Sequence, residues 1–437
     1  MTGVLTTVIA IAVVVVGVLA SIALHEVGHM VPAKRFGVRV SQYMVGFGPT
    51  LWSRTRGETE YGIKAIPLGG YVRMVGMFPP ARPDEPGGRG FFASVAADAR
   101  AASTEEIRPG EEHRAFYHLS APKKVVVMLG GPFMNLLIAA VLLLVVFVGI
   151  GLPAATTTVA TVQPCVTTSP EAGQECAAGD PASPAAEAGL QPGDAVVSFG
   201  GETVTGWAQL VGLVQSAAGT PTPVVVERDG QDLALTITPV EIERPVLDAN
   251  GSPVLDDAGD PVTQPGGFAG FSPSVVRQSA GLGVATEALW EQVSGTAGII
   301  VTLPVRVVEA AQSLAGAERG ADSVMSVVGV GQVAVDVAQG DSPVLDRVVT
   351  MLLLLAALNV ALFVFNLLPV LPLDGGHVVN ALYEGAKRQV ARLRGAPRPG
   401  PADVARMMPV AYVMFFVLIG VGVLLIANDI ANPVTLG

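Results

Sequence analysis

Long apolar runs alternate with polar, Gly- and Pro-containing segments along this chain of 437 residues. Four runs hold no charged residue, and each is long enough to cross the hydrocarbon core of a bilayer as a helix. They cover about residues 4–24, 125–152, 348–368 and 407–426. Two further stretches, 299–308 and 324–337, carry charges and helix breakers. We expect these two to form amphipathic or surface helices rather than spans.

Shorter runs with alternating apolar and polar residues predict β-structure in two places. The first surrounds Pro67-Leu68-Gly69-Gly70 and predicts a β-hairpin at about residues 60–77 with its turn at these residues. The second covers residues 156–240, where strand-like runs at 224–227 and 233–238 mix with turns. The pattern therefore predicts a polytopic α-helical membrane protein of about four transmembrane helices, with a membrane-associated β-hairpin and an exterior β-rich domain.

Composition and charge add an orientation. Half of the residues are hydrophobic and only 14% are charged, which is below the share usual in soluble domains. Segment 31–124 holds fourteen of the 26 Lys and Arg and segment 376–406 holds six, whereas 151–347 holds six against 23 Asp and Glu. The positive-inside rule makes the first two segments cytoplasmic and the acidic one exterior. The net charge of −11 argues against a nucleic-acid partner.

The N-terminal end of the chain has no positive region before its first apolar run. No Lys or Arg precedes residue 34, whereas a cleaved secretory signal would begin with basic residues. We therefore expect a retained span whose N-terminus lies outside. The two cysteines, Cys165 and Cys176, then lie in the exterior segment, where they could form a disulfide or remain free thiols.

The first apolar run ends in the sequence His25-Glu26-Val27-Gly28-His29. On a helix, the two histidines four residues apart face the same side and can hold one zinc ion, with Glu26 beside it as general base. The alternative is a pair of core histidines with satisfied hydrogen bonds. Ionisable groups at membrane depth are costly, and the chain has only five histidines, so a metal site is the better interpretation.

A second polar interruption occurs in the third apolar run. Prolines, paired glycines and Asp374 break it, which is tolerated where a helix lines a buried, hydrated cavity. Asp374 is the best third zinc ligand, and His377 is its competitor on chemistry alone. Asn135, in the second run, could either join helices by hydrogen bonds or contact substrate carbonyls. The hairpin around Gly69 and Gly70 could accept an unwound substrate as an added strand.

The exterior segment contains the run Ser183-Pro-Ala-Ala-Glu-Ala-Gly-Leu-Gln-Pro-Gly-Asp194, followed by Val196–Gly201. This run resembles the core of PDZ domains of the bacterial protease type, which capture extended peptide ends by strand addition. The wider order of motifs is similar to that of intramembrane site-2 zinc metalloproteases of the bacterial PDZ-containing type. It comprises H-E-x-x-H, the hairpin, Gly131-Pro132-x-x-Asn135, Ser326–Gly329 and N-x-x-P…L-D-G. The string from Leu367 to His377 looks most like actinobacterial members, although Pro369 and Pro372 are three apart where many bacterial members have P-x-P.

The resemblance implies a function and a set of site residues. It implies His25, His29 and Asp374 as ligands of Zn²⁺, Glu26 as general base, and Asn366 and Asn135 as substrate-positioning groups. The implied enzyme is a zinc metalloendopeptidase of regulated intramembrane proteolysis in the bacterial plasma membrane. Its substrates would be single-span regulators of the anti-sigma factor type, first trimmed outside by an initiating site-1 protease. The exterior domain would filter or receive the trimmed end.

Together these interpretations divide the chain into eight segments. They are 1–33, the first transmembrane helix; 34–121, a cytoplasmic loop with the hairpin; 122–152, the second transmembrane helix; 153–242, the PDZ-like domain; 243–345, exterior hairpins and amphipathic helices; 346–380, the third transmembrane helix with its interruption; 381–403, a cytoplasmic loop; and 404–428, the fourth transmembrane helix.

Two other functions use part of the same features. A non-proteolytic scaffold could hold membrane proteins with the PDZ-like domain, but a pseudoenzyme would be expected to have lost Glu26 or a ligand. A metal transporter could use His25, His29 and Asp374 as a transit site. That hypothesis leaves Glu26 and the peptide-capturing domain unexplained.

Overall fold

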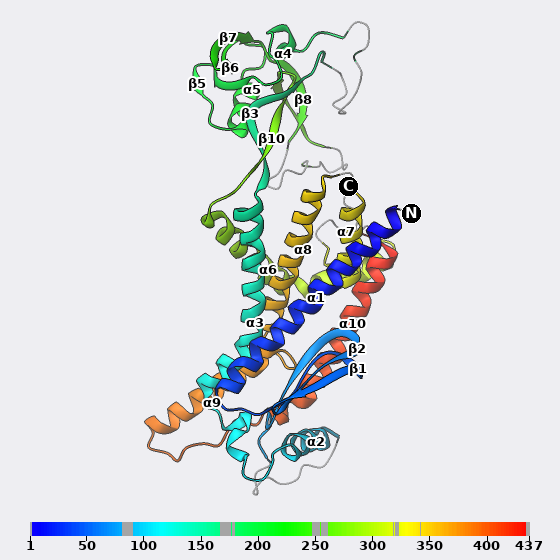
Figure 1. Ribbon diagram of the computed structural model, residues 1–437, viewed down its shortest axis with the longest axis vertical. Helices are drawn as coiled ribbons and strands as arrows, with labels where there is room; N and C mark the ends of the chain where they lie inside the picture. The colour runs from blue at the N-terminus through cyan, green and yellow to red at the C-terminus, as the bar shows by residue number, and fades with distance from the viewer. Residues whose placement is uncertain are drawn as a thin grey trace. The chain divides into compact units, whose positions relative to one another are not determined.

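The chain forms two units in the computed structural model, which describes residues 2–80, 91–166, 176, 180–246, 254, 261–317, 319, 323–340 and 342–433 (Figure 1). The first unit comprises Met1–Ile150 and Ala280–Gly437, and the second comprises Gly151–Ser279. We call them the helical unit and the β-rich unit.

The helical unit is built around long apolar helices. Its helices are α1 (Thr2–Arg35), α2 (Phe91–Glu105), α3 (Ala121–Leu144) with a π-helical extension (Val145–Ile150), α6 (Leu282–Leu314), α7 (Val327–Gln339), α8 (Val344–Asn366), α9 (Asp374–Leu393) and α10 (Met408–Ala431), with short 3₁₀ turns at Glu112–Arg114, Phe116–His118 and Val404–Met407. The four predicted spans coincide with α1, α3 and its extension, α8 and α10.

A fifth helix, α6, is also long and apolar enough to cross a membrane, by length and composition only. Two residues before it, Ala280 donates its N–H to the carbonyl of Phe147 in the extension of α3, 2.8 Å away. Near its other end, Ser313 accepts from the side chain of Asn432, just after α10. The extension of α3 and the C-terminal end of α10 lie at the same end of this unit as the start of α1 (Figure 1). Both ends of α6 are therefore held at one end of the bundle, and α6 runs across that end.

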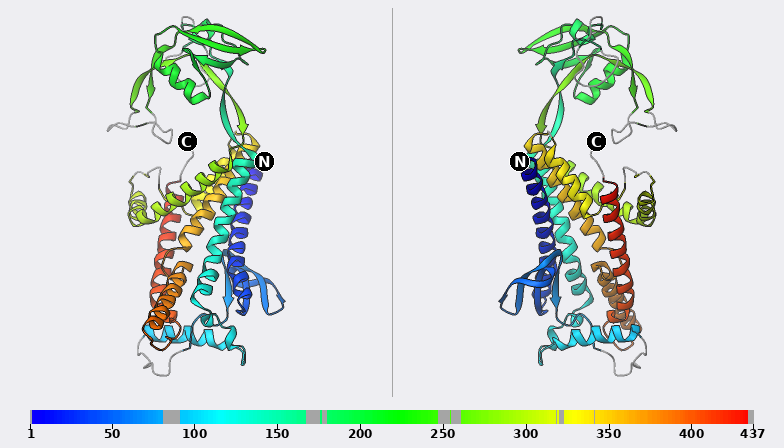
Figure 2. Two further views of the ribbon diagram at one scale, coloured as in Figure 1. Left: turned by 90° about the vertical axis from the view of Figure 1, so that its left-hand side faces the viewer. Right: turned by 90° about the vertical axis from the view of Figure 1, so that its right-hand side faces the viewer.

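The β-hairpin is longer than predicted, and its turn lies elsewhere. It consists of β1 (Val40–Arg56) and β2 (Thr59–Met74), joined at Gly57-Glu58, and Gly57 has a φ of +65°. The Pro-Leu-Gly-Gly sequence at residues 67–70 lies inside β2, so the prediction of a turn there was wrong. Both strands bend, so that residues 42–45 pair with 60–63 on one side and with 70–73 on the other. Figure 2 shows the hairpin along the C-terminal half of α1.

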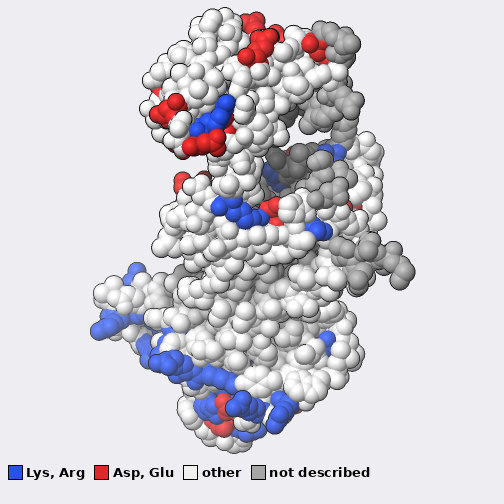
Figure 3. All heavy atoms as spheres, turned by 45° about the horizontal axis from the view of Figure 1, so that its top comes forward, with Lys and Arg blue, Asp and Glu red and all other residues white. Residues whose placement is uncertain are grey.

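Two segments that were predicted as cytoplasmic loops contain helices. Helix α2 lies within the predicted loop 34–121 and runs across the end of the bundle (Figure 2). Helix α9 extends to Leu393, so the predicted loop 381–403 is helical over its first part. Figure 3 shows Lys and Arg gathered at this end of the helical unit.

The β-rich unit contains an antiparallel sheet with the strand order β10-β3-β4-β6-β7, and β5 pairs with β4. Strands β8 and β9 form a separate pair, and α5 packs on β9. The elements are β3 (Leu152–Val162), α4 (Pro184–Glu187), β4 (Ala195–Phe199), β5 (Glu202–Thr203), α5 (Trp207–Ser216), β6 (Thr222–Arg228), β7 (Gln231–Ile237), β8 (Val240–Pro245), β9 (Thr263–Phe268) and β10 (Phe271–Gln278). The predicted boundary at residue 242 differs from that of this unit, because β10 pairs with β3 and extends the unit to Ser279.

The core of the β-rich unit follows from the alternation of its strands. Inward-facing residues of β4 and β6, such as Phe199 and Val224, pack against Leu210 of α5. Asp229 and Gly230 both have positive φ and form the two-residue turn between β6 and β7, as the right-handed strand twist favours. Cys165 and Cys176 are joined by a disulfide. Within the exterior hairpins predicted for segment 243–345, residues 247–253 and 255–260 lie outside the described residues.

Candidate metal centre

Two glycines allow α1 and α3 to touch backbone to backbone. A Cβ at Gly28 would overlap the carbonyl of Gly130, and a Cβ at Gly130 would overlap the carbonyl of Gly28. Small residues at helix crossings permit this close approach in membrane proteins. The crossing places the last turns of α1 directly against α3.

This crossing orients both histidines of α1. The Nδ1–H of His29 donates to the carbonyl of Val127 on α3 at 2.8 Å, so Nε2 is the nitrogen left with a free lone pair. The side-chain amide of Asn135 lies 3.1 Å from Nδ1 of His25. An amide turned with its oxygen toward a protonated Nδ1 would accept that proton and leave Nε2 of His25 free as well. Ring nitrogens held in this way are characteristic of metal-binding histidines.

The third group comes from the start of α9. Gly375 and Gly376 follow Asp374 and pack against the backbone of the turn that connects α8 to α9. A Cβ at Gly375 would overlap the carbonyl oxygens of Leu367 and Leu368, and one at Gly376 would lie 2.6 Å from the N of Leu371. The two glycines thus let the chain turn sharply enough for Asp374 to reach α1.

The three side chains converge on one point. Nε2 of His25 and Nε2 of His29 are 3.2 Å apart, and each is 3.3 Å from Oδ2 of Asp374. In a tetrahedral zinc site with bonds of about 2.0–2.1 Å, neighbouring ligand atoms are about 3.3 Å apart. Oδ2 of Asp374 is buried and has no hydrogen-bond donor within the described part of the chain. The donor set and its spacing therefore fit a zinc ion.

Gly131 leaves the room that such an ion needs. A Cβ at this position would overlap Nε2 of His29 and would lie 2.7 Å from Nε2 of His25. The sequence Gly130-Gly131 thus has two functions: the first glycine allows the helix crossing, and the second keeps open the space in front of the imidazole nitrogens.

Glu26 lies on the side of α1 that faces the hairpin. The backbone of Val72 in β2 lies near its carboxylate, and a Cβ at Gly70 would lie 3.2 Å from its Cγ. The hydroxyl of Tyr43 in β1 donates to the carbonyl of Ala23 at 2.8 Å. Burial, with a smaller contribution from the charge of Glu26, raises the pKa of Tyr43 to about 12, so this hydroxyl keeps its proton at neutral pH. The hairpin is therefore fastened beside Glu26.

The other predicted site residues are placed less directly. Gly69 has a φ of +113°, and a Cβ there would lie 2.6 Å from the ring of Phe47. Within the described residues, the amide of Asn366 donates to the carbonyl of Leu362 one turn earlier on α8. His377 follows Asp374 by less than one turn of α9, and the described ligand atoms that cluster are those of His25, His29 and Asp374.

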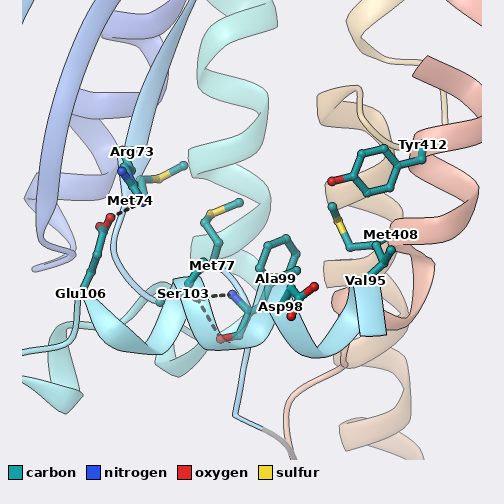
Figure 4. Close-up of a pocket in the computed structure, with 13 residues that line it drawn as sticks. Arg73, Met74, Met77, Val95, Asp98, Ala99, Ser103, Glu106, Met408 and Tyr412 are labelled. Carbon is teal, nitrogen blue, oxygen red and sulfur yellow. Dashed lines mark hydrogen bonds and ion pairs between the residues drawn. The ribbon is translucent and has the colours of Figure 1, made fainter. Parts of the chain in front are cut away.

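A cavity of about 470 Å³ lies away from these residues, where β2 ends. Met74, Met77 and Met408 surround it with Tyr412, and they come from β2, the segment after it and α10 (Figure 4). Arg73 and Glu106 form an ion pair at its rim, 2.5 Å between Nη2 and Oε1. Asp98 and Ser103 of α2 also line the cavity, so α2 lies next to the end of β2 at this point.

Comparison with known proteins places this arrangement in a family. A model of peptidase family M50 matches residues 13–397. The chain belongs to peptidase family M50. This M50 peptidase is 32% identical over 431 residues to the zinc metalloprotease Rip1 of Mycobacterium tuberculosis, with 96% of each chain covered. It is 32% identical over 442 residues to the zinc metalloprotease Rip1 of Mycolicibacterium smegmatis, with 98% of each covered.

A more distant relative is the metalloprotease MmpA of Caulobacter vibrioides, 28% identical over 386 residues, with 85% of each chain covered. These comparisons confirm the resemblance to site-2 zinc metalloproteases and to actinobacterial members. The M50 peptidase is a zinc metalloprotease, and its long apolar helices are those of a multi-pass membrane protein.

Several residues that build the centre were not identified as functional from the sequence. The carbonyl of Val127, the missing side chain of Gly131 and the hydroxyl of Tyr43 all contribute through contacts with α1. Gly131 had a local signal, since paired glycines in an apolar helix indicate a close approach. A backbone carbonyl such as that of Val127 leaves no such signal in the sequence.

Proposed function

We propose that the M50 peptidase is an intramembrane endopeptidase that cleaves the transmembrane segments of single-span proteins, such as anti-sigma factors. The convergence of His25, His29 and Asp374, beside Glu26 on an apolar helix, carries the proposal. These three residues hold zinc, and Glu26 is the general base. Bound zinc polarises the scissile carbonyl and makes water more acidic.

The residues around the zinc site orient the histidines, transfer a proton and position the substrate. Val127 and Asn135 hold the imidazole rings of His29 and His25 in place. The carboxylate of Glu26 takes a proton from the attacking water and passes it to the nitrogen of the leaving amine. Asn366 lies at the end of α8 before the turn into α9, and we assign it, together with Asn135, to substrate positioning.

A substrate helix must unwind before its carbonyls can react, because they are hydrogen-bonded along the helix. The unwound segment adds as a strand to the edge of β2 at Gly69 and Gly70. The backbone of Val72 supports this choice: it lies near the carboxylate of Glu26, whereas residues 42–45 of β1 pair with the opposite edge. A peptide at this edge would satisfy its backbone groups next to the general base.

The β-rich unit acts as a PDZ-like domain on the extracytoplasmic side. Strand β10 is at the edge of its sheet, and a hollow of about 80 Å³ lies between α5 and residues 268–271. An extended peptide end could add to β10 and place a side chain in this hollow. The domain would receive or exclude the ends of substrates that a site-1 protease has already cut.

The orientation and localisation also belong to this proposal. The Lys and Arg at the end of the helical unit that carries α2 and α9 indicate the cytoplasmic side of the bacterial plasma membrane. Four helices cross the bilayer, and α6 lies along its outer surface. This disposition of α6 is supported by the hydrogen bonds that hold both of its ends at one end of the bundle.

Purified protein in detergent tests the activity with a single-span reporter. Wild type should cut the reporter, whereas Glu26→Gln should bind an equal amount of zinc but cut about 10²- to 10⁴-fold more slowly. Zinc in both proteins with equal cutting rates would remove Glu26 from the mechanism. A wild-type protein that binds no zinc would contradict the proposed centre.

A second pair of variants tests the third ligand. Asp374→Asn should lose zinc, because a neutral amide is a poor zinc ligand, whereas His377→Ala should keep it. Zinc content measured on both variants decides between the two residues. Full zinc in Asp374→Asn together with loss of zinc in His377→Ala would assign the ligand to His377.

A further inference from the structure

A buried ion-pair cluster joins α3 to α9 outside the metal centre. Nζ of Lys124 on α3 lies 2.7 Å from Oε2 of Glu384 on α9, and the two side chains are only 7% and 1% exposed. Arg388, one turn further along α9, lies 2.7 Å from the other carboxylate oxygen. Oε2 of Glu384 also accepts the N–H of Ala402, in the segment that leads to α10.

Burying such charges is expensive, because their desolvation offsets most of their mutual attraction. Apolar residues at the same positions would hold two helices together at least as well. The best-attested use of a buried polar or charged pair is to select one register between two elements. Lys124 and Glu384 pair close to the point where α3 and α9 approach each other, since a Cβ at Gly385 would lie 3.1 Å from the Cβ of Ala121.

The two helices that this pair joins carry the two halves of the centre. Lys124 lies one turn before Val127, whose carbonyl holds His29, and the same helix continues to Gly131 and Asn135. Glu384 lies ten residues after Asp374, which is about 15 Å along the axis of α9. A site needs its groups within about 0.5 Å of their working geometry. Over about 15 Å, this tolerance corresponds to a tilt of α9 of about 2°.

We propose that Glu384 is a positioning residue: its ion pair with Lys124 sets α9 against α3 so that Asp374 meets the two histidines. The inference rests on the proposed function, since it takes Asp374 to be the third ligand. Arg388 contributes differently, because it pairs with Glu384 within α9 and does not link the two helices.

The test uses two single substitutions in the full-length protein. Lys124→Met removes the link to α3 but leaves Glu384 paired with Arg388, so no isolated charge is buried. Arg388→Met is the matched control, because it removes the partner on α9 and keeps the link. Zinc affinity is measured by competition with a chelator of known affinity. We expect Lys124→Met to weaken zinc binding about 10- to 100-fold, as loss of a ligand-supporting contact does. Arg388→Met and the conservative Lys124→Arg should stay within about threefold of wild type.

Two further measurements distinguish a positioning role of the Lys124–Glu384 pair from a general loss of stability. Raising the free zinc concentration should restore cleavage by Lys124→Met, because its site is weakened but still present. Asp429→Asn, which breaks the buried Arg319–Asp429 pair at the opposite end of the bundle, should lower thermal stability without changing zinc affinity. Wild-type affinity in Lys124→Met, or an equal loss in Arg388→Met, would overturn the positioning role.

Failure of the proposed function gives its own result. If Asp374→Asn binds zinc as tightly as wild type, the ligand assignment is wrong and the inference fails with it. If Asp374→Asn loses zinc while Lys124→Met keeps it, the ligand assignment stands and only the positioning role is rejected.

Discussion

The interiors of the two units differ in the share of polar groups that they bury and in the apolar side chains that they expose. The core of the β-rich unit is mostly apolar and includes Val159, Phe199 and Leu210, although Ser183 and Asp194 are buried in this unit as well. In the helical unit, Asn135 and Asn359 are fully buried, while large side chains such as Phe416 and Val301 are 66% and 81% exposed. Water drives apolar groups into the first interior, whereas lipid is as apolar as leucine and gives helices no such drive. Close packing at small residues and internal hydrogen bonds must then hold the helices together.

This difference explains where a metal centre can be built. Burying two histidines and an aspartate in the β-rich core would displace the apolar contacts that stabilise it. In the helical unit the interior contains small and polar groups beside its apolar ones, so polar side chains at the centre displace fewer apolar contacts. Four substitutions, taken from the largest expected effect to the smallest, test this contrast.

The first prediction concerns the space in front of the histidines. Gly131→Ala should lower zinc affinity by on the order of 100-fold and abolish cleavage, because its Cβ would overlap Nε2 of His29. The measurement is zinc content after dialysis against a weak chelator, together with reporter cleavage. Gly422→Ala on α10, where a Cβ meets nothing within 4 Å, is the control and should retain both. Equal zinc in the two variants would show that Gly131 is not needed for space.

The second prediction concerns the apolar core. Phe199 is 2% exposed, and Phe199→Ala should destabilise the β-rich unit by about 3–5 kcal/mol through lost burial and a cavity. Hydrogen exchange of β4 and β6 in the full-length protein would measure the loss. Zinc binding should be unchanged, and a parallel fall in zinc affinity would contradict the separation of the two interiors.

The third prediction concerns a charged pair of the β-rich unit, Asp194 and Arg228. Asp194 accepts two hydrogen bonds from Arg228, both 2.7 Å, and one from the N–H of Gln191, 2.8 Å. The Arg228 guanidinium, despite some opposing burial, holds the pKa of Asp194 below its usual value. Its contribution to stability is therefore full above about pH 4, the pKa of an unfolded aspartate, and is lost as the pH falls through the lower folded value.

Asp194→Asn should remove that pH dependence and cost about 1–3 kcal/mol at neutral pH. Hydrogen exchange of β6 between pH 3 and pH 7, compared for the two proteins, provides the measurement. An unchanged acid profile in Asp194→Asn would show that other carboxylates dominate it.

The smallest effect is expected for a hydrogen bond inside the helical unit. The amide of Asn359 on α8 donates to the hydroxyl of Ser21 on α1 at 2.9 Å. Asn359→Leu should cost only about 0.6 kcal/mol, because a partly unfolded chain in a membrane also finds polar partners. Reversible unfolding in mixed detergent would measure it. A cost above about 2 kcal/mol would mean that bilayer hydrogen bonds stabilise this unit more than is usual.

The sequence predicted elements better than contacts. The four uncharged runs form helices, as predicted. Length and apolar composition are properties of the segment itself, so the sequence alone is enough to identify such helices. The approach of Asp374 to His25 and His29 agrees with an expectation that rested on ligand chemistry. The hairpin turn was misplaced because Gly69 marks a bend inside β2, whereas Gly57 marks the turn, and both glycines have positive φ.

Other features depended on partners that are distant in sequence. In the sequence, Glu384 is one charge in a predicted cytoplasmic loop. In the structure it is buried and paired with Lys124, which is 260 residues away, so the sequence gives no sign of its burial. Strand β10 joined the β-rich unit because β3 was available to pair with it. Hydropathy identified part of α6 as apolar. The direction in which α6 runs depends on the contacts of Ala280 with Phe147 and of Ser313 with Asn432, which hydropathy does not predict.

The contact between Gly28 and Gly130 also limits the routes by which a polypeptide can enter. Where two helix backbones touch, nothing as thick as an extended peptide can pass between them unless the helices separate. Separation of the helices would move the Val127 carbonyl away from His29 and break the hydrogen bond that orients this imidazole. Under the proposed function, a peptide must therefore approach Glu26 from the side of α1 that faces β2, because α1 and α3 leave no space between their backbones.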